Sequence, residues 1–491
     1  MGTGLLWLRR DLRLADNPAL HALLDAGHLP IPLYIHDEPD PDWPLGAASA
    51  WWLHHSLAAL GKALRQRGSD LIVLAGDTRR QLFQAIATSG AQAVYWNRCH
   101  EPAVAARDLA VQASLRRRGI EANSYNSALL REPAELLKKD GTPYRVFTPF
   151  WKALHGIGPV RDPLPPPDRL PALPRGKLEG TTIDALKLLP SIPWDRGFYD
   201  CWQPGENGAR NALEDFLEER LPGYATARDI PDKPGTSRLS AHLHYGDIGP
   251  VQLWQATMER AATDPAAGTW SGAECWLREL GWREFSAHQL HHFPHTASQP
   301  LDPRFRDFPW RTDYADMLAR WQQGRTGIPI VDAGMRELWT TGYMHNRVRM
   351  LAASFLCKNL LIPWQEGARW FWDTLVDADL ASNTMGWQWT AGCGADAAPY
   401  FRIFNPSLQG ERFDGAGRYV RRWVPELAKL EARHIHRPWS AGPALLADAG
   451  IRLGGEYPEP LVDLKASRQA ALAAWKRIKR RRASHTRHGP E

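Results

Sequence analysis

AVYWNRCHEPAVAARDLAVQASLRRRGIEANSY, residues 93–125, decides the fold of the first part of the chain. The apolar runs at 93–97 and 120–125 have the length and composition of buried strands. Between them, a segment with helical periodicity begins with an acid and a proline at 101–102, has arginines in its last turn and stops at Gly119. A strand, a helix and a second strand in this order predict a parallel α/β layer.

The same alternation continues through the N-terminal part of the chain, where GLLWL, IPLYIH and LIVLAG are further apolar runs between amphipathic stretches. We therefore expect residues 1–130 to form an α/β domain with a parallel, Rossmann-like sheet. Residues 131–205 include RDPLPPPDRLPALP, which is too rich in proline for regular helix and predicts an interdomain connector. Apolar residues recur at helical spacing in 206–475, which predicts an all-α domain, and 476–491 are expected to form a disordered basic tail.

The composition of the 491 residues is that of a globular protein, apart from 23 Trp, which is more than core packing demands. The cysteines are scattered without a C-x-x-C pair, which argues against a disulfide framework and a thiolate zinc site. No signal peptide precedes LLWLRRDLRL, and no apolar stretch approaches the length of a bilayer span. We expect a soluble, monomeric protein of the cytoplasm with no membrane partner.

The net charge of +6 comes from one end of the chain. Residues 476–490 contain seven Lys or Arg and no acid, so the rest of the chain has no excess of basic residues. We interpret this tail as a frayed helix end or a solubilising extension rather than as a binding arm. Evidence for a nucleic-acid partner must therefore come from local groups of residues.

Two common ligand-binding patterns occur in the wrong context. The GxGxxA match at Gly392, Gly394 and Ala397 follows GWQWTA rather than a strand and runs into a proline, so we interpret it as a loop. The histidines of AHQLHHFPH, residues 287–295, have zinc-like spacing, but no acid or cysteine accompanies them. We predict no metal site.

The stretch GYMHNRVRML places polar side chains inside an otherwise apolar run. On a helix, Asn346, Arg349 and Met350 share one face, whereas Val348 and Leu351 lie on another. We expect the apolar face to pack in the core and the other face to meet a ligand that is polar but also flat or apolar in part.

The stretch AECWLRELGWREFSAH repeats this design. Glu279, Trp282 and Arg283 share a helix face, and Trp276 lies about one turn earlier on the same side. Spacing alone leaves an alternative open, which is an interhelical ion pair surrounded by core aromatic side chains.

Two further groups of residues add to these helices. LVDADLASNTMGWQW brings two carboxylates, an amide and two indoles close together in sequence, namely Asp377, Asp379, Asn383, Trp387 and Trp389. KPGTSRLSAH places hydroxyl groups around an arginine just before a helix, and these are donors that a pyrophosphate needs. This second group consists of Thr236, Ser237, Arg238, Leu239 and Ser240.

These four blocks, together with WLRRDLRLADNPAL and AAPYFRIFNPSLQGERFD, resemble the photolyase/cryptochrome family over nearly the whole chain. The resemblance implies an antenna-binding α/β domain and a helical domain that binds FAD in a folded, U-shaped pose. It implies that Asp377 pairs with Arg349 beside the isoalloxazine and that Asn383 faces N5. The residues implied to line the flavin are Tyr224, Thr236, Ser237, Arg238, Leu239, Ser240, Trp276, Glu279, Arg283, Asn346, Arg349, Asp377, Asp379 and Asn383.

Three residues indicate which branch of the family the chain resembles. Photolyases for the pyrimidine (6-4) photoproduct carry histidines where this chain has Asn346 and Met350. Plant-type cryptochromes place Asp and an aliphatic residue there, and commonly Tyr at the position of Trp282. The residues at all three positions of this chain resemble those of enzymes that repair cyclobutane pyrimidine dimers. Splitting such a dimer requires an electron rather than a proton. A cryptochrome-like blue-light photoreceptor with FAD is the alternative, and a helical scaffold without light chemistry ranks last.

The resemblance implies UV-damaged DNA as the partner, with the dimer flipped out of the duplex. Trp282 and Trp389 would flank the fused bases, Met350 would form a polarisable floor, and Glu279 and Asn346 would bond the pyrimidine edges. These five are the expected catalytic residues, and Glu279 and Trp282 also contact DNA. The expected phosphate contacts are Arg228, Arg347 and Arg402, for which ordinary surface charge is the alternative.

Three tryptophans, Trp387, Trp364 and Trp310, match the family's relay of electrons from the surface to the flavin. Without the resemblance, core packing is the simpler explanation for each.

The antenna chromophore remains open because Ala103 and Val104 replace the Asn-Glu pair of folate-binding bacterial photolyases. Methenyltetrahydrofolate bound in another way is favoured, and a deazaflavin or no antenna is the alternative. Thr384 and Met385 also depart from the family's usual Asn-Asn-Gly-Gly form, near the adenine side. We expect this departure to leave catalysis unchanged.

Overall fold

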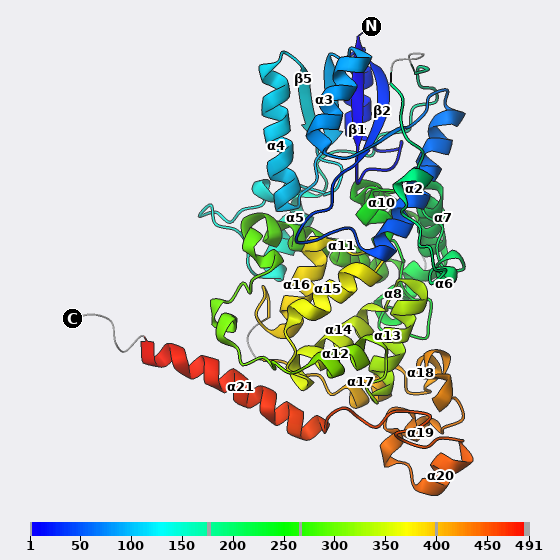
Figure 1. Cartoon of the computed structure of the whole chain (residues 1–491), viewed down its shortest axis with the longest axis vertical. Coiled ribbons are helices and arrows are strands. Elements are labelled where there is room, and N and C mark those ends of the chain that lie inside the picture. The colour runs from blue at the N-terminus through cyan, green and yellow to red at the C-terminus, as the bar shows by residue number, and fades with distance from the viewer. Residues whose placement is uncertain (1, 174–177, 265–267, 398–400, 486–491) are drawn as a thin grey trace, which may run out of the picture. The chain divides into compact units, whose positions relative to one another are not determined.

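The strand–helix–strand unit that the sequence predicts is present (Figure 1). Strand β4 (Ala93–Asn97) leads into α4 (Pro102–Arg117), and β5 (Glu121–Tyr125) then lies parallel to β4. Glu101 is the N-cap residue of α4, and Gly119 has a φ of +74°, the left-handed conformation that commonly follows a helix. The local signals at both ends of this helix are confirmed.

This computed structural model describes residues 2–173, 178–264, 268–397 and 401–485. The chain packs into two compact units, and each is described here by itself. We call the first the sheet unit; it comprises Met1–Ala225, Thr236–His292 and Val376–Asp379. We call the second the helical unit; it comprises Thr226–Gly235, Phe293–Leu375 and Leu380–Glu491.

The sheet has five parallel strands in the order β3-β2-β1-β4-β5. Strand β1 (Thr3–Leu8) lies at its centre, between β4 and β2 (Leu29–His36), and β3 (Ile72–Ala75) is at one edge. Strands β1, β2 and β4 read as nearly continuous, largely buried apolar runs, as expected where helices cover both faces of a parallel sheet, whereas the edge strand β5 is more polar. The predicted parallel α/β class is confirmed.

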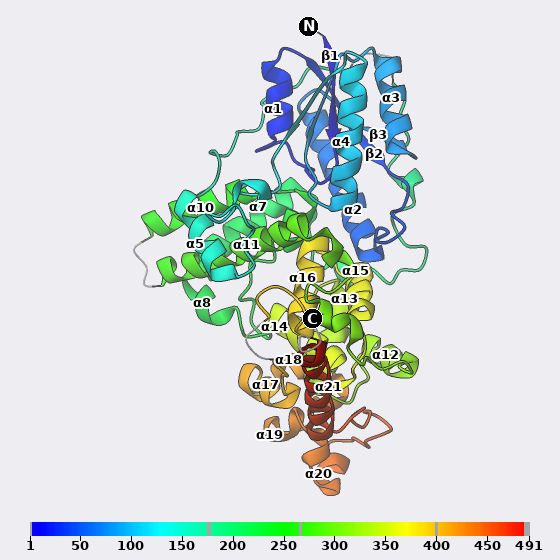
Figure 2. The same cartoon turned by 90° about the vertical axis from the view of Figure 1, so that its left-hand side faces the viewer.

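Alternate residues of β1 face different helices. Leu5 and Trp7 belong to one core cluster with the buried side chains of α3 (Thr78–Ser89) and α4. Gly4 faces the other way, since a Cβ added there would lie 2.6 Å from Cδ1 of Leu23 on α1 (Pro18–Asp25). Figure 2 shows α1 on one side of the sheet and α3 and α4 on the other.

The rest of the sheet unit is helical, including part of the predicted connector. Helix α5 (Phe147–Ile157) lies within residues 131–205, where the abundance of proline predicts irregular chain, and it packs against α11 (Thr269–His292). A Cβ added at Gly281 of α11 would lie 2.4 Å from Cε3 of Trp151 on α5, so the two helices approach closely. The other α-helices of this unit are α2 (Ala47–Gln66), α6 (Arg196–Tyr199), α7 (Glu206–Asp215), α9 (Ser240–Tyr245) and α10 (Pro250–Thr263).

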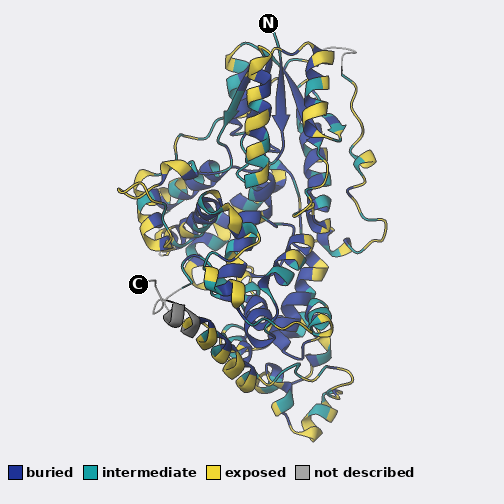
Figure 3. Cartoon of the chain, turned by 60° about the vertical axis from the view of Figure 1, so that its left-hand side comes forward, coloured by how far each residue is buried: buried dark blue, intermediate teal, exposed yellow. Residues whose placement is uncertain are grey.

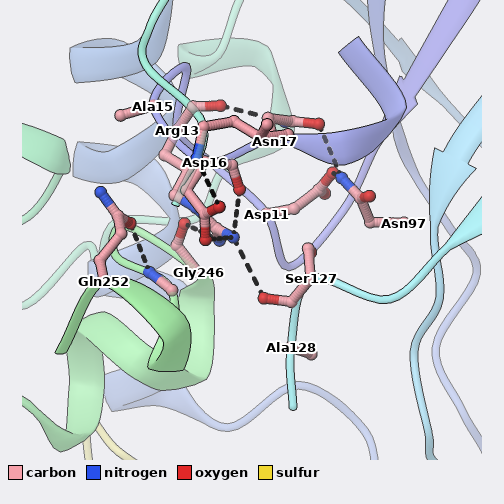
Figure 4. A network of polar contacts seen from close by, with 12 residues as sticks. Asp11, Arg13, Ala15, Asp16, Asn17, Asn97, Ser127, Ala128, Gly246 and Gln252 are labelled. Carbon is pink, nitrogen blue, oxygen red and sulfur yellow. Dashed lines mark hydrogen bonds and ion pairs between the residues drawn. The ribbon is translucent and has the colours of Figure 1, made fainter. Parts of the chain in front are cut away.

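A buried polar network ties the loop after β1 to the helices of the sheet unit (Figure 4). Arg13, which is 1% exposed, donates to the carbonyl oxygens of Asp16 at 2.7 Å, Gly246 at 3.0 Å and Ser127 at 3.1 Å. The fully buried carboxylate of Asp16 also pairs with Arg161. Because every buried charge here has partners, the network holds WLRRDLRLADN in one conformation.

The helical unit contains most, but not all, of the range 206–475 that the sequence predicts to be all-α. Every regular element that the structure describes in 206–475 is helical, and α8 (Tyr224–Ala227) crosses from the sheet unit into the helical unit. Among the helices of the described ranges, none combines the length and apolar character that crossing a bilayer requires. The remaining helices of the helical unit are α12 (Ala315–Gln322), α13 (Pro329–Thr341), α14 (Asn346–Ser354), α15 (Trp364–Thr374), α16 (Leu380–Ala391), α17 (Pro406–Phe413), α18 (Arg418–Trp423), α19 (Ala432–Ile435), α20 (Pro443–Asp448) and α21 (Leu464–His485).

Two boundaries differ from the sequence prediction. The expected disordered tail from residue 476 is wrong as far as His485, because α21 continues to that residue, whereas 486–491 lie outside the described residues. The division by packing also differs from the predicted domains, because α10 and α11 belong to the unit that contains the sheet. The domain boundaries near 130 and 205 stay predictions.

A buried lysine follows α14, in a π-helical turn, η7 (Phe355–Asn359). Lys358 is 1% exposed, donates to the carbonyl oxygen of Ala391 at 2.6 Å, and has Nζ 3.0 Å from the ring centre of Phe401. Burial lowers the pKa of its ammonium group to about 7. Single π-turns often mark functional regions of helices, and here the turn directs a cation toward the end of α16.

A Lys358→Met variant is expected to be more stable than the wild type near pH 7, by roughly 1–3 kcal/mol, because it removes a buried charge. The pKa of Lys358 is about 7 in the folded protein and higher in the unfolded chain. Above pH 7, unfolding is therefore accompanied by uptake of a proton at this side chain. Wild-type stability therefore rises with pH from about 7 to about 10, and the advantage of the variant should disappear across that range. Urea unfolding followed by circular dichroism measures both proteins. A pH-independent difference would contradict the buried charge.

Candidate functional site

The four predicted residues of α11 lie where the helical spacing places them. Trp276 is buried and its ring lies 5.1 Å from that of Phe216, which in turn contacts Tyr224 edge-on at 5.4 Å. Glu279, one turn further along, is half-buried. The sheet unit therefore joins Trp276 and Tyr224, two residues implied to line the flavin, through Phe216, which sequence reasoning missed.

Trp282 is stacked on a second aromatic ring that the sequence did not reveal. Phe147 of α5 lies parallel to it, with ring centres 3.6 Å apart and an angle of 7° between the planes. The guanidinium carbon of Arg278 is 5.3 Å from the ring centre of Phe147. Phe147 is buried and Trp282 is half-buried, so the stack fixes the indole plane from one side.

The next turn of α11 binds the loop that follows β5. Arg283 donates to the carbonyl oxygen of Ala128 at 2.6 Å, and Glu284 accepts from the backbone N–H of Leu130 at 3.0 Å. Burial raises the pKa of Glu284 to about 7. Arg283 thus has a structural hydrogen bond in addition to its predicted place beside the flavin, which stays a prediction.

The segment from Thr236 to Ser240 lies directly before and at the start of α9. Arg238 has a φ of +56° and its guanidinium carbon is 4.3 Å from the ring centre of Trp202, so its head group lies over an indole. Arg220 donates to the carbonyl oxygen of Thr236 at 3.4 Å. Thr236 and Ser237 are half-buried and Ser240 is exposed, while Leu239 packs in the core.

The two carboxylates that follow α15 lie in a tight turn. The backbone N–H of Asp379 donates to the carbonyl oxygen of Asp377 at 2.8 Å, and Oδ2 of Asp379 lies 3.9 Å from Nδ1 of His244. Burial lowers the pKa of His244, although Asp379 acts in the opposite direction. Both carboxylates are half-buried, so the turn presents acceptors at the edge of the sheet unit's packed interior.

Helix α14 of the helical unit has the two faces that the sequence predicts. Val348 and Leu351 are buried, whereas Asn346 is exposed and Arg349 and Met350 are half-buried. Figure 3 shows the mixture of buried and exposed residues along the helices of this unit. The side chains of the polar face are therefore less buried than those of the apolar face.

The N-terminus of α14 is capped by a neutral histidine. Nδ1 of His345 accepts from the backbone N–H of Arg347 at 3.2 Å, which requires that this nitrogen carries no proton. Burial lowers the pKa of His345 to about 4, so the imidazole is neutral near pH 7. Arg349 donates through Nε to the carbonyl oxygen of Met344 at 2.7 Å. These contacts orient the start of the helix that carries Asn346.

The three arginines expected at DNA phosphates have different surroundings. Arg347 donates to Asp229 at 2.6 Å and lies 4.5 Å from the ring centre of Phe413, so it is already paired. Arg402 is exposed, and its guanidinium carbon is 5.8 Å from the ring centre of Trp389. Arg228 is half-buried beside Asp229 in sequence. The structure therefore brings Arg402 together with Trp389 and joins Arg347 to an acid.

Asn383 and Trp387 are held by the packing of α16 against α15. Asn383 donates to the carbonyl oxygen of Ala368 at 3.0 Å. A Cβ added at Gly367 would lie 2.0 Å from Cη2 of Trp387, so glycine leaves the space that the indole occupies. Trp387 is 3% exposed and contacts the rings of Trp321 and Phe371 at 6.2 and 5.0 Å.

The other two tryptophans of the expected relay also lie in the helical unit. Trp364 is 1% exposed at the start of α15, and Trp310 is half-buried with its ring 4.3 Å from that of Phe308. This gradient from buried to partly exposed side chains suits a path toward the surface, but each contact also serves core packing. The relay stays a prediction.

Comparisons with known proteins extend over both units. Residues 4–168 match the model of a family described as DNA photolyase, and 276–477 match one described as FAD binding domain of DNA photolyase. The chain is 48% identical to a deoxyribodipyrimidine photo-lyase of Agrobacterium fabrum, over 97% of this chain and 98% of that protein. It is 38% identical to Cryptochrome-2 of Arabidopsis thaliana, over 97% of this chain and 79% of that protein. The crystal structure of a bacterial class III photolyase from Agrobacterium tumefaciens has a TM-score of 0.93 at 47% identity, over 98% of each chain.

The matches agree with the order of the motifs along the sequence. The N-terminal match includes the parallel sheet and WLRRDLRLADN, and the C-terminal match includes the α11, α14 and α16 residues described above. Residues 398–400 of the C-terminal block lie outside the described residues. With a family model over each part and close relatives over almost the full length, the chain belongs to the photolyase/cryptochrome family.

Proposed function

We propose that this protein is a deoxyribodipyrimidine photo-lyase that repairs cyclobutane pyrimidine dimers in DNA, in the cytoplasm and on the nucleoid. The observation that carries the proposal is the polar face of α14, where Asn346 is exposed and Met350 is half-buried. Neither side chain can donate the proton that (6-4) repair requires, and both suit a dimer that is split by an electron. The close similarity to a photo-lyase of Agrobacterium fabrum supports the same assignment.

The donor groups of the chain fit FAD. Thr236, Ser237 and the guanidinium group of Arg238 have the chemistry that a pyrophosphate needs, and Asp377 and Asp379 can accept from ribityl or ribose O–H groups or from ring N–H groups. We propose Tyr224, Leu239, Ser240, Trp276, Glu279, Arg283, Asn346, Arg349 and Asn383 as the remaining flavin residues. When bound, the reduced flavin supplies one electron to the dimer after it absorbs light, and recovers it at the end.

The chain's own residues position the lesion and exclude water. Trp282, whose indole is fixed by Phe147, and Trp389, with Arg402 beside it, are proposed to flank the fused pyrimidines. Glu279 and Asn346 are proposed to hydrogen-bond the base edges, which would stabilise the charge that develops on the dimer. Met350 supplies apolar contact without donating a proton.

The proposed phosphate contacts are not equivalent. Arg402 is exposed, whereas Arg347 is half-buried and donates to Asp229. We propose all three, Arg228, Arg347 and Arg402, as contacts to DNA phosphates. We assign Arg347 a role in holding Asp229 and the start of α14.

Two further assignments follow the family resemblance. Trp387, Trp364 and Trp310 are proposed to carry electrons to the flavin during photoreduction. Methenyltetrahydrofolate is the proposed antenna chromophore in the sheet unit. A deazaflavin stays the alternative, because the usual pterin-binding carboxylate is absent where this chain has Ala103 and Val104.

A cryptochrome-like blue-light photoreceptor is the second candidate. The similarity to Cryptochrome-2 of Arabidopsis thaliana over 97% of this chain favours it. Against it, Asn346, Met350 and Trp282 are the residues of dimer repair rather than those of plant-type receptors.

The test is light-dependent repair by the purified, flavin-loaded protein. Blue light with a reductant is expected to restore the thymines of dimer-containing DNA, and a dark sample should not change. An Asn346→His/Met350→His variant is expected to lose this repair, because both side chains at the lesion are replaced. Bound flavin that is photoreduced without any repair would favour the receptor, and a chain that cannot be loaded with flavin would contradict both candidates.

A further inference from the structure

Helix α21 is a fixed part of the helical unit, although its sequence suggests a loose basic end. Ser467, Ala471, Ala474 and Ile478 are buried and recur every three or four residues, so they form one stripe along the helix. This stripe faces η7 and η6 (Pro303–Asp307), against which α21 packs.

Two contacts fix the position of α21. The amide of Asn359 in η7 donates to Oγ of Ser467 at 2.9 Å, with both side chains buried. The ring of Trp475 stacks on Phe401, with ring centres 5.2 Å apart and an angle of 2° between the planes. Phe401 also contacts the ammonium group of Lys358, so the stack connects α21 to the core.

The exposed face of α21 is cationic. Residues 464–485 contain eight Lys or Arg and no Asp or Glu. The exposed cations whose side chains are described are Lys465, Arg468, Lys476, Arg477 and Lys479. Within the described part of the chain, no acidic side chain pairs with any of the five, whereas most other arginines of the helical unit have an acid partner or a carbonyl acceptor.

The geometry of the helix spreads these charges along a line. At about 1.5 Å per residue, Lys465 and Lys476 are separated by roughly 16 Å along the helix axis. At 100° per residue, Lys465, Arg468, Lys476 and Lys479 all lie within about a quarter of the circumference, roughly 130° around the helix from the centre of the buried stripe. A row of unpaired cations on a rigid support matches an extended polyanion with regularly spaced phosphates.

We propose that this face of α21 binds the phosphate backbone of DNA, as a contact that does not read the lesion. That the polyanion is DNA rests on the proposed function, which is the repair of DNA. A membrane surface fits less well, because an interfacial helix inserts an apolar face into lipid, and here that face is already buried against the helical unit. The contact would raise the affinity for damaged and undamaged duplexes alike.

The test compares two full-length variants with equal changes in charge. Lys476→Gln/Arg477→Gln/Lys479→Gln removes three cations from α21, and glutamine retains the helix propensity of lysine and arginine. The control, Arg79→Gln/Arg80→Gln/Arg117→Gln, removes three exposed cations from α3 and α4 of the sheet unit. A Lys476→Arg/Arg477→Lys/Lys479→Arg variant keeps the charge of α21. The dissociation constant for an undamaged duplex of about two helical turns is measured at several salt concentrations.

The α21 variant is expected to bind the duplex roughly 100- to 1,000-fold more weakly at 0.1 M salt, with a salt slope reduced by about 2 to 3. The control and the charge-preserving variant should behave as the wild type does. Equal losses in the α21 and control variants, or an unchanged α21 variant, would overturn the proposal. So would binding to phosphatidylserine vesicles that depends on α21 while DNA binding does not. Because the duplex is undamaged, this result is independent of repair: a wild type that binds it through α21 but shows no light-driven repair would contradict only the proposed function.

Discussion

Photoreduction of the bound flavin is expected to be almost abolished in a Trp387→Phe variant, whereas chemically reduced variant protein should repair dimers at nearly the wild-type rate. Phenylalanine keeps a ring against Trp321 and Phe371 but is far harder to oxidise than indole. Photoreduction is followed by flavin absorbance under blue light with an external donor, and repair is measured after reduction with dithionite.

Two matched variants separate electron transfer from packing around Trp387. Gly367→Ala places a methyl group against Cη2 of the Trp387 indole, so it should displace the ring and lower the free energy of unfolding by about 1–3 kcal/mol. Because the indole is still present but displaced, photoreduction should be slower than in the wild type. Trp321→Phe removes a neighbouring indole that is outside the predicted relay, and it should leave photoreduction close to normal. If Trp387→Phe reduces photoreduction and repair equally, Trp387 only packs.

A Trp282→Ala variant is expected to bind dimer-containing DNA roughly 5- to 150-fold more weakly, since stacking of a base on an aromatic side chain contributes about 1–3 kcal/mol. The indole is half-buried and supported on one side by Phe147, so its plane is fixed before any base arrives. This preorganisation lowers the entropic cost of stacking. Titration of the variant with single-dimer and undamaged duplexes measures the loss, which should be confined to the damaged one.

Phe147→Leu is the companion to this prediction. Leucine keeps apolar volume in α5 but removes the ring that supports Trp282, so we expect a smaller, dimer-specific loss of affinity. Flavin content should stay normal in both variants. A Trp282→Ala variant that binds damaged and undamaged DNA exactly as the wild type does would show that the indole lies outside the lesion site.

The fold was largely predictable from local sequence signals, and its exceptions have long-range causes. The start and end of α4 follow from residues within it, and the two faces of α14 follow from spacing alone. Helix α5 was missed because the prolines around it dominate the segment, while its packing partner, α11, is more than 100 positions away. The end of α21 was missed because Trp475 and its partner Phe401 are distant in sequence.

The candidate site shows the same limit. The sequence identifies the residue types that a flavin and a lesion need, but it does not show which of them have other partners. Arg347 pairs with Asp229, which lies 118 positions earlier, and Trp282 stacks on Phe147 of another helix. Propensity and periodicity contain no information about such pairs, so their contribution appears only in the folded chain.

Repair of one bound dimer by pre-reduced protein tests the central claim most directly. The protein, reduced in the dark and saturated with an oligonucleotide that contains one thymine dimer, is illuminated without oxygen or added donor. The claim predicts that ultraviolet absorbance of thymine recovers in proportion to the bound dimer, and that the flavin is again fully reduced afterwards. Unchanged thymine absorbance, with both flavin and damaged DNA shown to be bound, would contradict it.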